Sequence, residues 1–388
     1  LITYLRYPKP TTLHHRQRIA VAFLQAQRKT LPWKLLCWVT KRITTAQAVT
    51  RYCSSRGIPH RIVRLDPLPH NESGSRNGSG SGSVTIPPAV LHVLTPPGSS
   101  RDGGGRALIY FHGGGYVNPL RGGAHMPFIL GCARAAGVQK VVVVEYSLAP
   151  EFPYPAQLVQ CIEAVRYVMS EMKVKAEDII LGGDSAGGQL VGGVLAHVVR
   201  SCGWCLPLEL KNKDERFGSA VMVSPFVRVP LPKTSNGKTS YEVNEGRDYL
   251  SREQVDQFKV EFGANERDLY ANLCVEEEIW GEIFGPDGGR GVVDKVLVTV
   301  GTGEVFLDCC RFFAERCLKG EVVEVKRGMS AAEIKGLFTV EGNKSEYVLV
   351  ECEGETHVQP ALDAVVGYED GLMNGAIMAW LERHFAGS

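Results

Sequence analysis

The first 65 residues of this chain contain no aspartate or glutamate, although they contain thirteen lysines and arginines. The remainder carries 30 basic and 42 acidic residues, so the formal net charge of +1 conceals two parts of opposite sign. A basic segment of this kind is attracted to an anionic membrane surface or serves in targeting, and it can equally pack as a basic surface on an acidic body. The chain begins at Leu1, which indicates that the start of the reading frame lies outside this sequence.

No run of 18 apolar residues occurs in the sequence, which excludes a membrane-spanning helix. The stretch 18–42 instead mixes phenylalanine, leucine and tryptophan with six basic residues. A helix of this composition can lie in a membrane interface, but such helices more often pack on a core or cover an active site. We therefore expect residues 1–60 to form a basic helical cap or arm, with peripheral membrane contact as the open alternative.

The eleven cysteines have irregular spacing and an odd number, which does not fit a disulfide framework and favours free thiols. Free thiols favour an intracellular location. Cys202 and Cys205 have the C-x-x-C spacing of a redox pair, but the surrounding sequence lacks the βαβ pattern that accompanies such pairs. The sequence therefore predicts no redox role for them.

Phosphate-binding signatures are also missing. Neither G-x-x-x-x-G-K-[ST] nor G-x-G-x-x-G occurs, and the nearest approach, over 301–306, lacks the third glycine. No nucleic-acid-binding module accompanies the basic arm, so nucleic acid is not an expected partner. The sequence also contains no internal repeat.

Short apolar, β-branched runs occur at 106–111, 140–146, 178–183, 219–224, 295–300 and 346–351. Helix-like segments separate them, at 155–172, 187–200, 306–318 and 361–385. Strands that are apolar throughout are typical of a parallel sheet covered on both faces, so the chain is predicted to be an α/β protein with a mostly parallel, doubly wound sheet. Ligands of such sheets bind beyond the carboxyl ends of the strands.

One further strand is expected at 90–94, between two Gly/Ser-rich flexible loops at 71–83 and 96–106. We interpret these segments as loops of a hairpin and not as a domain boundary. Residues 61–388 are therefore predicted to form a single catalytic domain.

The segment G-D-S-A-G, over 183–187, matches the G-x-S-x-G pattern and lies between a predicted strand and a predicted helix. In a nucleophile elbow the serine occupies a strained strand-to-helix turn, and small residues on either side let the two elements approach. The helix N-terminus then places backbone N–H groups near the serine hydroxyl. We predict Ser185 as the nucleophile, supported by Asp184; a glycine-rich turn without a catalytic role is the alternative.

A second glycine cluster, His112-Gly113-Gly114-Gly115, follows the predicted strand 106–111. Consecutive glycines let the backbone approach a substrate with its N–H groups exposed. We expect Gly114 and Gly115 to form an oxyanion hole with Ala186. Gly113 and His112 are expected to support this loop.

A serine nucleophile needs a base, and the base needs an orienting acid. The loop after strand 295–300 offers Glu304, with Asp308 one helical turn later. Glu304 is nearer the strand end and is the predicted acid. His357, between the last strand and the last helix, is the predicted base. The order serine, acid, histidine is that of α/β-hydrolases.

With these motifs together, the chain resembles the hormone-sensitive-lipase-like branch of the α/β-hydrolases, including fungal acetyl-ester and steryl-acetate hydrolases. "HGGG" and "GDSAGG" are signatures of that branch, and "EYSLAPEFPYPA" over 145–156 is similar to another of its segments. Two positions depart from the family pattern, since Ser147 replaces an arginine and Glu304 replaces the first aspartate of D-P-L-x-D. The resemblance covers about residues 106–385. It implies that the N-terminal segment and an insertion at about 225–290 form a cap over the substrate pockets.

The sequence thus predicts a serine hydrolase of carboxylic esters, without metal or organic cofactor. By resemblance, the expected substrate is a small hydrophobic ester with a short acyl group, most simply acetyl. Acyl transfer or cyclisation on the same triad is an alternative within enzymes. A small-molecule receptor built on the same fold is an alternative of another class.

Overall fold

The computed structural model describes residues 12–66, 86–98, 105–212, 214–227, 237–285, 291–339 and 346–385. The expected flexible loop at 71–83 lies outside these residues, as do most of the loop at 96–106 and parts of the insertion at 225–290.

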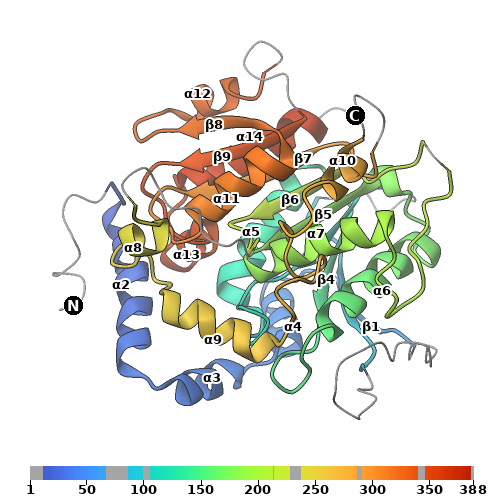
Figure 1. The fold of residues 1–388 in the computed structure, drawn as a ribbon, viewed down its shortest axis with the longest axis horizontal. Helices are drawn as coiled ribbons and strands as arrows, with labels where there is room; N and C mark the ends of the chain where they lie inside the picture. The colour runs from blue at the N-terminus through green and yellow to red at the C-terminus, as the bar shows by residue number, and fades with distance from the viewer. Residues whose placement is uncertain are drawn as a thin grey trace.

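A sheet of nine strands forms the centre of the described structure, in the order β1-β2-β4-β3-β5-β6-β7-β9-β8 (Figure 1). The strands are β1 His60–Arg64, β2 Val90–Leu94, β3 Ala107–Phe111, β4 Lys140–Glu145, β5 Ile179–Asp184, β6 Ser219–Val223, β7 Val296–Gly301, β8 Glu321–Val325 and β9 Tyr347–Cys352. The two antiparallel pairs are those that β2 forms with its neighbours β1 and β4. The strands from β4 to β8 in this order are all parallel, which confirms the predicted fold class.

The sequence did not reveal β1 and β8, which are the two edge strands of the sheet. In β8, three of the five residues are exposed, and glutamates interrupt its valines. In β1, two arginines and a histidine interrupt the apolar pattern. An edge strand is covered less completely than a central one, so it lacks the continuous apolar run that identified the others.

Helices cover both faces of the sheet, and each face has its own apolar core. One core includes residues of α6 Ala156–Ser170, α7 Ala186–Val199, α10 Ile279–Phe284 and α11 Leu307–Phe313. The other includes residues of α4 Thr45–Ser55, α5 Gly122–Ala135, α12 Ala331–Gly336 and α14 Leu372–Phe385. Burial on both sides explains why the central strands are apolar throughout.

The helix expected over 361–385 is in fact two helices, α13 Gln359–Val366 and α14. Gly367 adopts a left-handed conformation with φ 60° and ends α13. A left-handed glycine directly after the last helical residue is a common helix stop, and it allows the chain to turn before α14 begins.

The remaining helices gather beside the carboxyl ends of the strands. Figure 1 shows α2 His15–Thr30 and α3 Trp33–Lys41, in blue, along the same side of the molecule as α8 Ser240–Asn244 and α9 Arg252–Phe262, in yellow. The ring of Trp33 in α3 contacts that of Phe258 in α9, with centroids 5.0 Å apart. Segments more than 200 residues apart in sequence therefore meet above the strand ends. No helix among the described residues is long and apolar enough to cross a membrane.

Candidate active site

Ser185 stands between β5 and α7 in a strained backbone conformation, with φ 52° and ψ −116°. A positive φ at a non-glycine residue costs about 1–3 kcal/mol and persists only where the surroundings impose it. Here the N–H of Ser185 donates to the carbonyl of Val223 at 2.8 Å. A side chain at Gly183 would run into the backbone of Gly187, and one at Gly187 would run into the carbonyl of Phe111. The glycines thus permit the close approach that holds the serine in this turn.

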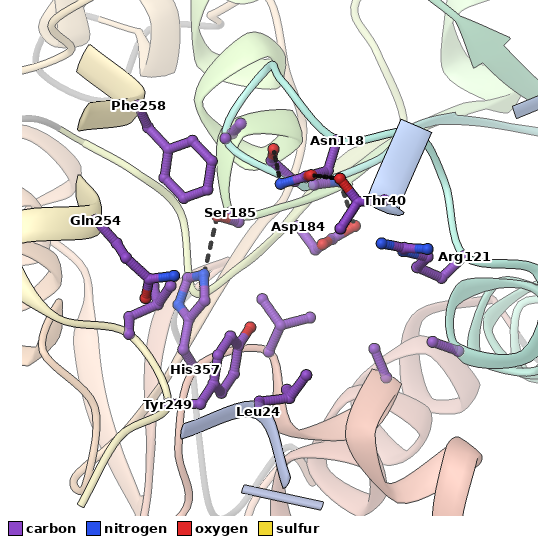
Figure 2. A pocket seen from close by; sticks show the side chains of 18 of the residues that line it. Leu24, Thr40, Asn118, Arg121, Asp184, Ser185, Tyr249, Gln254, Phe258 and His357 are labelled. Atoms are coloured by element: carbon purple, nitrogen blue, oxygen red, sulfur yellow. Dashed lines mark hydrogen bonds between the residues drawn. The ribbon is translucent and has the colours of Figure 1, made fainter. Parts of the chain in front are cut away.

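The imidazole of His357 lies between Ser185 and Glu304. Its Nε2 is 2.9 Å from Ser185 Oγ (Figure 2). Its Nδ1 is 2.9 Å from Glu304 Oε2. Glu304 is fully buried, and its other oxygen accepts from the N–H of Gly301 at 2.7 Å and from Ser224 Oγ at 3.1 Å. With Nδ1–H donating to the carboxylate, the lone pair of Nε2 faces the serine hydroxyl. A continuous hydrogen-bonded chain therefore joins the three side chains.

Asp308, the other acid considered from sequence, points elsewhere. Its carboxylate accepts from the N–H of Ser240, the first residue of α8, at 2.6 Å. Ser240 Oγ in turn donates to the carbonyl of Val305 at 2.7 Å. Asp308 lies in the first turn of α11, and its carboxylate holds the start of α8 against the loop that carries Glu304.

The glycine loop after β3 lies directly opposite Ser185. Gly114 and Gly115 have φ values of 117° and 62°, which favour glycine. A Cβ at Gly115 would enter the ring of Phe258 in α9, and one at Gly114 would lie 2.6 Å from the carbonyl oxygen of Asn118. Within the described part of the chain, no hydrogen bond engages the N–H groups of Gly114, Gly115 or Ala186. All three residues line the same cavity as Ser185.

Asp184 holds the glycine loop in place through hydrogen bonds to its carboxylate. Its Oδ1 accepts from Tyr110 Oη at 2.7 Å and from the N–H of Gly113 at 3.0 Å, and Oδ2 lies 3.5 Å from His125 Nε2. Burial opposes ionisation, but His125, Tyr110 and the Gly113 N–H outweigh it and hold the pKa of Asp184 below its ordinary value. The carboxylate therefore anchors the loop to the residue that precedes the serine.

His112 also supports this loop. Its ring stacks on Tyr146 with centroids 4.4 Å apart, and its Nδ1 donates to the carbonyl of Gly113 at 2.7 Å. Burial lowers the pKa of His112 to about 4, so the ring is neutral at physiological pH. Tyr146 Oη donates to the carbonyl of His112 at 2.6 Å, which ties the loop to the end of β4.

Asp248 is a further site residue that the sequence did not reveal. It lies between α8 and α9, is fully buried, and accepts from the N–H of Val305 at 2.9 Å and of His357 at 3.4 Å. Burial raises the pKa of Asp248 to about 6, and the nearby charge of Glu304 acts in the same direction. No motif marks this residue, because it belongs to the insertion at 225–290. Asp248 is recognised as a site residue only from its hydrogen bonds to two loops that are distant in sequence.

The cavity above Ser185 has a volume of about 440 Å³. Its apolar wall combines residues of α2, α3 and the segment that carries α9, among them Leu24, Trp33, Leu36, Leu250 and Phe258. Polar groups lie at one side, where Thr40 donates to Asn118 Oδ1 at 2.5 Å and Asn118 Nδ2 donates to the carbonyl of Gly114 at 3.2 Å (Figure 2). Helix α3 is therefore hydrogen-bonded, through one side chain, to the glycine loop.

Among the residues that the structure describes, the side chains lining this cavity do not include a set suited to a metal ion. In the described ranges, no group of three or more histidine, cysteine or acidic side chains with close ligand atoms includes a residue of the cavity. The chemistry that the arrangement can perform is acyl transfer through a serine nucleophile.

Residues 108–331 match the family model described as the alpha/beta hydrolase fold. The chain belongs to the α/β-hydrolase family. Within the family, curated relatives place it in the hormone-sensitive-lipase-like branch. A Mycobacterium tuberculosis carboxylesterase/phospholipase, LipF, is 29% identical over 157 residues, which cover 40% of this chain and 38% of LipF. Human hormone-sensitive lipase is 36% identical over 86 residues, covering 21% of this chain and 8% of the lipase.

These alignments span well under two thirds of the relatives' own lengths. Solved structures agree over much more of the chain. An esterase of the bacterial hormone-sensitive lipase family superposes with a TM-score of 0.55 at 22% identity, covering 96% of this α/β-hydrolase and 99% of that chain. A thermostable esterase from Pseudomonas putida gives a TM-score of 0.59 at 17% identity, with 97% and 99% covered. At such identities the structures establish the fold.

Proposed function

We propose that this α/β-hydrolase is a serine hydrolase of carboxylic esters, with Ser185, His357 and Glu304 as its catalytic triad. One observation carries the proposal: the hydrogen-bonded chain from Ser185 Oγ through the His357 imidazole to the buried Glu304 carboxylate, facing a glycine loop across a cavity. The relatives named as carboxylesterases support the same reaction class.

In the proposed reaction, His357 Nε2 takes the proton of Ser185 Oγ while the oxygen attacks the ester carbonyl. Glu304 holds the imidazole in the required tautomer and stabilises the imidazolium that forms. The N–H groups of Gly114, Gly115 and Ala186 stabilise the tetrahedral oxyanion; removal of a single such donor costs about 3–4 kcal/mol in a serine protease. His357 then protonates the leaving alcohol. Water hydrolyses the acyl-enzyme by the reverse sequence of proton transfers.

The substrate proposed is a hydrophobic small molecule that carries a short acyl group, most simply acetyl. We propose that two segments form a cap over the substrate cavity: the N-terminal helices α2 and α3, and the insertion with α8 and α9. Side chains from both segments form the apolar wall of the cavity. An apolar alcohol portion would bury its surface there, at about 25 cal/mol per Å². Thr40, Asn118 and Arg121 offer polar contacts at the side opposite Gln254 and Phe258 (Figure 2).

We also propose that helices α2 and α3 contact a membrane surface. Large apolar side chains are exposed along both helices, with Phe23 61% and Trp38 59% exposed, and Ile19, Leu35 and Val39 also on the surface. They lie in the part of the chain that has basic but no acidic residues. Apolar side chains among basic ones are typical of a helix in the interface of an anionic membrane.

The test of the hydrolase proposal is turnover of chromogenic esters with acyl chains from acetyl to palmitoyl. Wild-type protein should hydrolyse the short esters, and mass spectrometry should find the acyl group on Ser185. S185A should lose turnover by roughly 10³ or more and should no longer react with a fluorophosphonate. S55A, which changes an exposed serine of α4, is the matched control. Retained labelling of S185A would contradict the assignment of the nucleophile.

A further inference from the structure

Two thiols meet at the far end of the helix that begins after Ser185. Helix α7 ends at Val199, and the following turn carries Cys202, Gly203, Trp204 and Cys205. Gly203 has φ 77°, so a left-handed residue lets the turn close. The two sulfur atoms lie 3.9 Å apart, and both thiols are free. This separation is short enough for one sulfur to reach the other after a small rotation of either side chain.

His197, in the last turns of α7, stands beside the first of these thiols. Its Nδ1 is 3.2 Å from Cys202 Sγ, and its Nε2 is 3.2 Å from the carbonyl oxygen of Leu206. The backbone N–H groups of Cys202 and Leu208 lie within 3.2 Å of the same ring nitrogens and fix its orientation. The ring is therefore held in hydrogen-bond contact with the Cys202 thiol, where it can assist loss of the thiol proton.

The two cysteines differ in exposure and in acidity. Cys202 is partly exposed, whereas Cys205 is buried. The hydrogen bond with Cys205 and the contact with His197 lower the pKa of Cys202 to about 5, while the hydrogen bond with Cys202 and burial raise the pKa of Cys205. An accessible thiolate next to a buried, protonated thiol is the arrangement in which one cysteine attacks and the other resolves.

We propose that Cys202 is a thiol-modification site that reacts with a low-molecular-weight disulfide, and that Cys205 converts the product to an internal disulfide. The Cys202 thiolate attacks one sulfur of the reagent, forms a mixed disulfide and releases one thiolate of the reagent. Cys205 then loses its proton and attacks Cys202 Sγ, which expels the second thiolate. The two protein thiols are oxidised, and one disulfide is reduced to two thiols. The sequence alone predicted no redox role for this pair, because no βαβ pattern surrounds it; the structure adds the contact between Cys202 and His197.

Trp204, between the two cysteines, provides a reporter of this reaction. Its ring makes edge contacts with Tyr154 and Tyr270, at centroid distances of 5.2 and 6.0 Å. An internal disulfide brings the sulfurs from 3.9 Å to about 2.05 Å, which rotates the cysteine side chains on either side of Trp204 and changes the surroundings of its ring. Oxidation should therefore change tryptophan fluorescence in the wild-type protein and leave it unchanged in W204F.

The experiment treats the reduced full chain with oxidised glutathione and locates the modified cysteines by peptide mass mapping. Wild-type protein should lose two hydrogens, in the peptide that contains Cys202 and Cys205. C205S should stop at one glutathione on Cys202, and C202S should form neither product. C37S is the control: Cys37 is also partly exposed, but burial raises the pKa of its thiol to about 11, so this variant should react as wild type does.

Three results would overturn the proposal. The first is a C205S protein that carries no glutathione on Cys202 at a concentration that fully oxidises wild type. The second is preferential reaction of another cysteine in wild-type protein. The third is a protein that is isolated with one zinc ion per chain and whose cysteines are oxidised only after a chelator has removed the zinc. None of these outcomes depends on ester hydrolysis, so they test the thiol site separately from the proposed enzymatic activity.

Discussion

The backbone N–H of His357 lies 3.4 Å from the buried carboxylate of Asp248. The same carboxylate accepts from the N–H of Val305, the neighbour of Glu304. One side chain from the insertion therefore contacts both loops that carry the proposed base and acid. Its main chain is held in turn by α2, because Gln25 Nε2 donates to the carbonyl of Asp248 at 2.9 Å.

D248N should lower kcat by about tenfold, because the amide keeps one acceptor and turns a donor toward the other backbone N–H, and a hydrogen bond of this kind is worth about 1 kcal/mol. KM should change little, since the carboxylate contacts the two loops and not the cavity wall. Steady-state kinetics with a short-chain ester provides the measurement. An unchanged kcat would show that Asp248 has no positioning role.

The same variant should alter how stability depends on pH. The folded-state pKa of Asp248 is raised to about 6, above its ordinary value. The stabilising effect of its neutral form is therefore complete below about pH 4 and is lost as pH rises through about 6. The Tm of wild-type protein relative to D248N should fall between pH 4 and 7. A difference in Tm that stays constant over this range would mean that Asp248 does not titrate there.

E304Q and D308N should separate the two acids. Replacing the carboxylate that orients the histidine by an amide should lower kcat by about 10⁴ with little change in Tm. Asp308 instead accepts from the N–H of Ser240, so D308N should keep most activity and lose about 1 kcal/mol of stability. Kinetics and thermal unfolding of both variants provide the test. The reverse ranking of kcat would make Asp308 the triad acid.

G115A should impair the proposed oxyanion hole. The new methyl group would enter the ring of Phe258, and φ 62° is unfavourable for alanine by about 1–2 kcal/mol. We expect kcat to fall roughly 10²-fold or more. G281A, which adds a methyl group in α10 where no atom lies within 4 Å, is the control and should be fully active. The double variant G115A/F258A should recover part of the lost kcat. If kcat does not recover, the collision with Phe258 in α9 is not the cause of the loss.

Vesicle sedimentation should test the membrane surface on α2 and α3. Wild-type protein should bind vesicles containing anionic lipid more than neutral vesicles, and binding should weaken as salt is raised, because surface charges are screened over about 8 Å at physiological ionic strength. F23S/W38S should bind less. V322S, which changes an exposed valine of the edge strand β8, should bind as wild type does. Equal binding to neutral and anionic vesicles would argue against the proposal.

Much of the fold could be predicted from local sequence. The strands from β3 to β7, with β9, are covered by helices on both faces, so burial required apolar residues at every position and left a continuous signal. The turn at Ser185 also left a signal that spans only a few consecutive residues, the G-x-S-x-G pattern. A side chain at Gly183 would collide with the backbone of Gly187, and one at Gly187 would collide with the carbonyl of Phe111 at the end of β3.

The tertiary structure decided the features that depend on residues far apart in sequence. Glu304 and Asp308 are one helical turn apart, and only the packing of α8 shows that the first faces His357 and the second faces Ser240. Asp248 carries no local signal, because its partners Val305 and His357 come from other loops. His197 and Cys202 are only five residues apart, but their contact depends on how the chain turns after α7. Hydrogen bonds between distant segments leave no periodic pattern in sequence, because each partner satisfies its geometry only after the sheet has assembled.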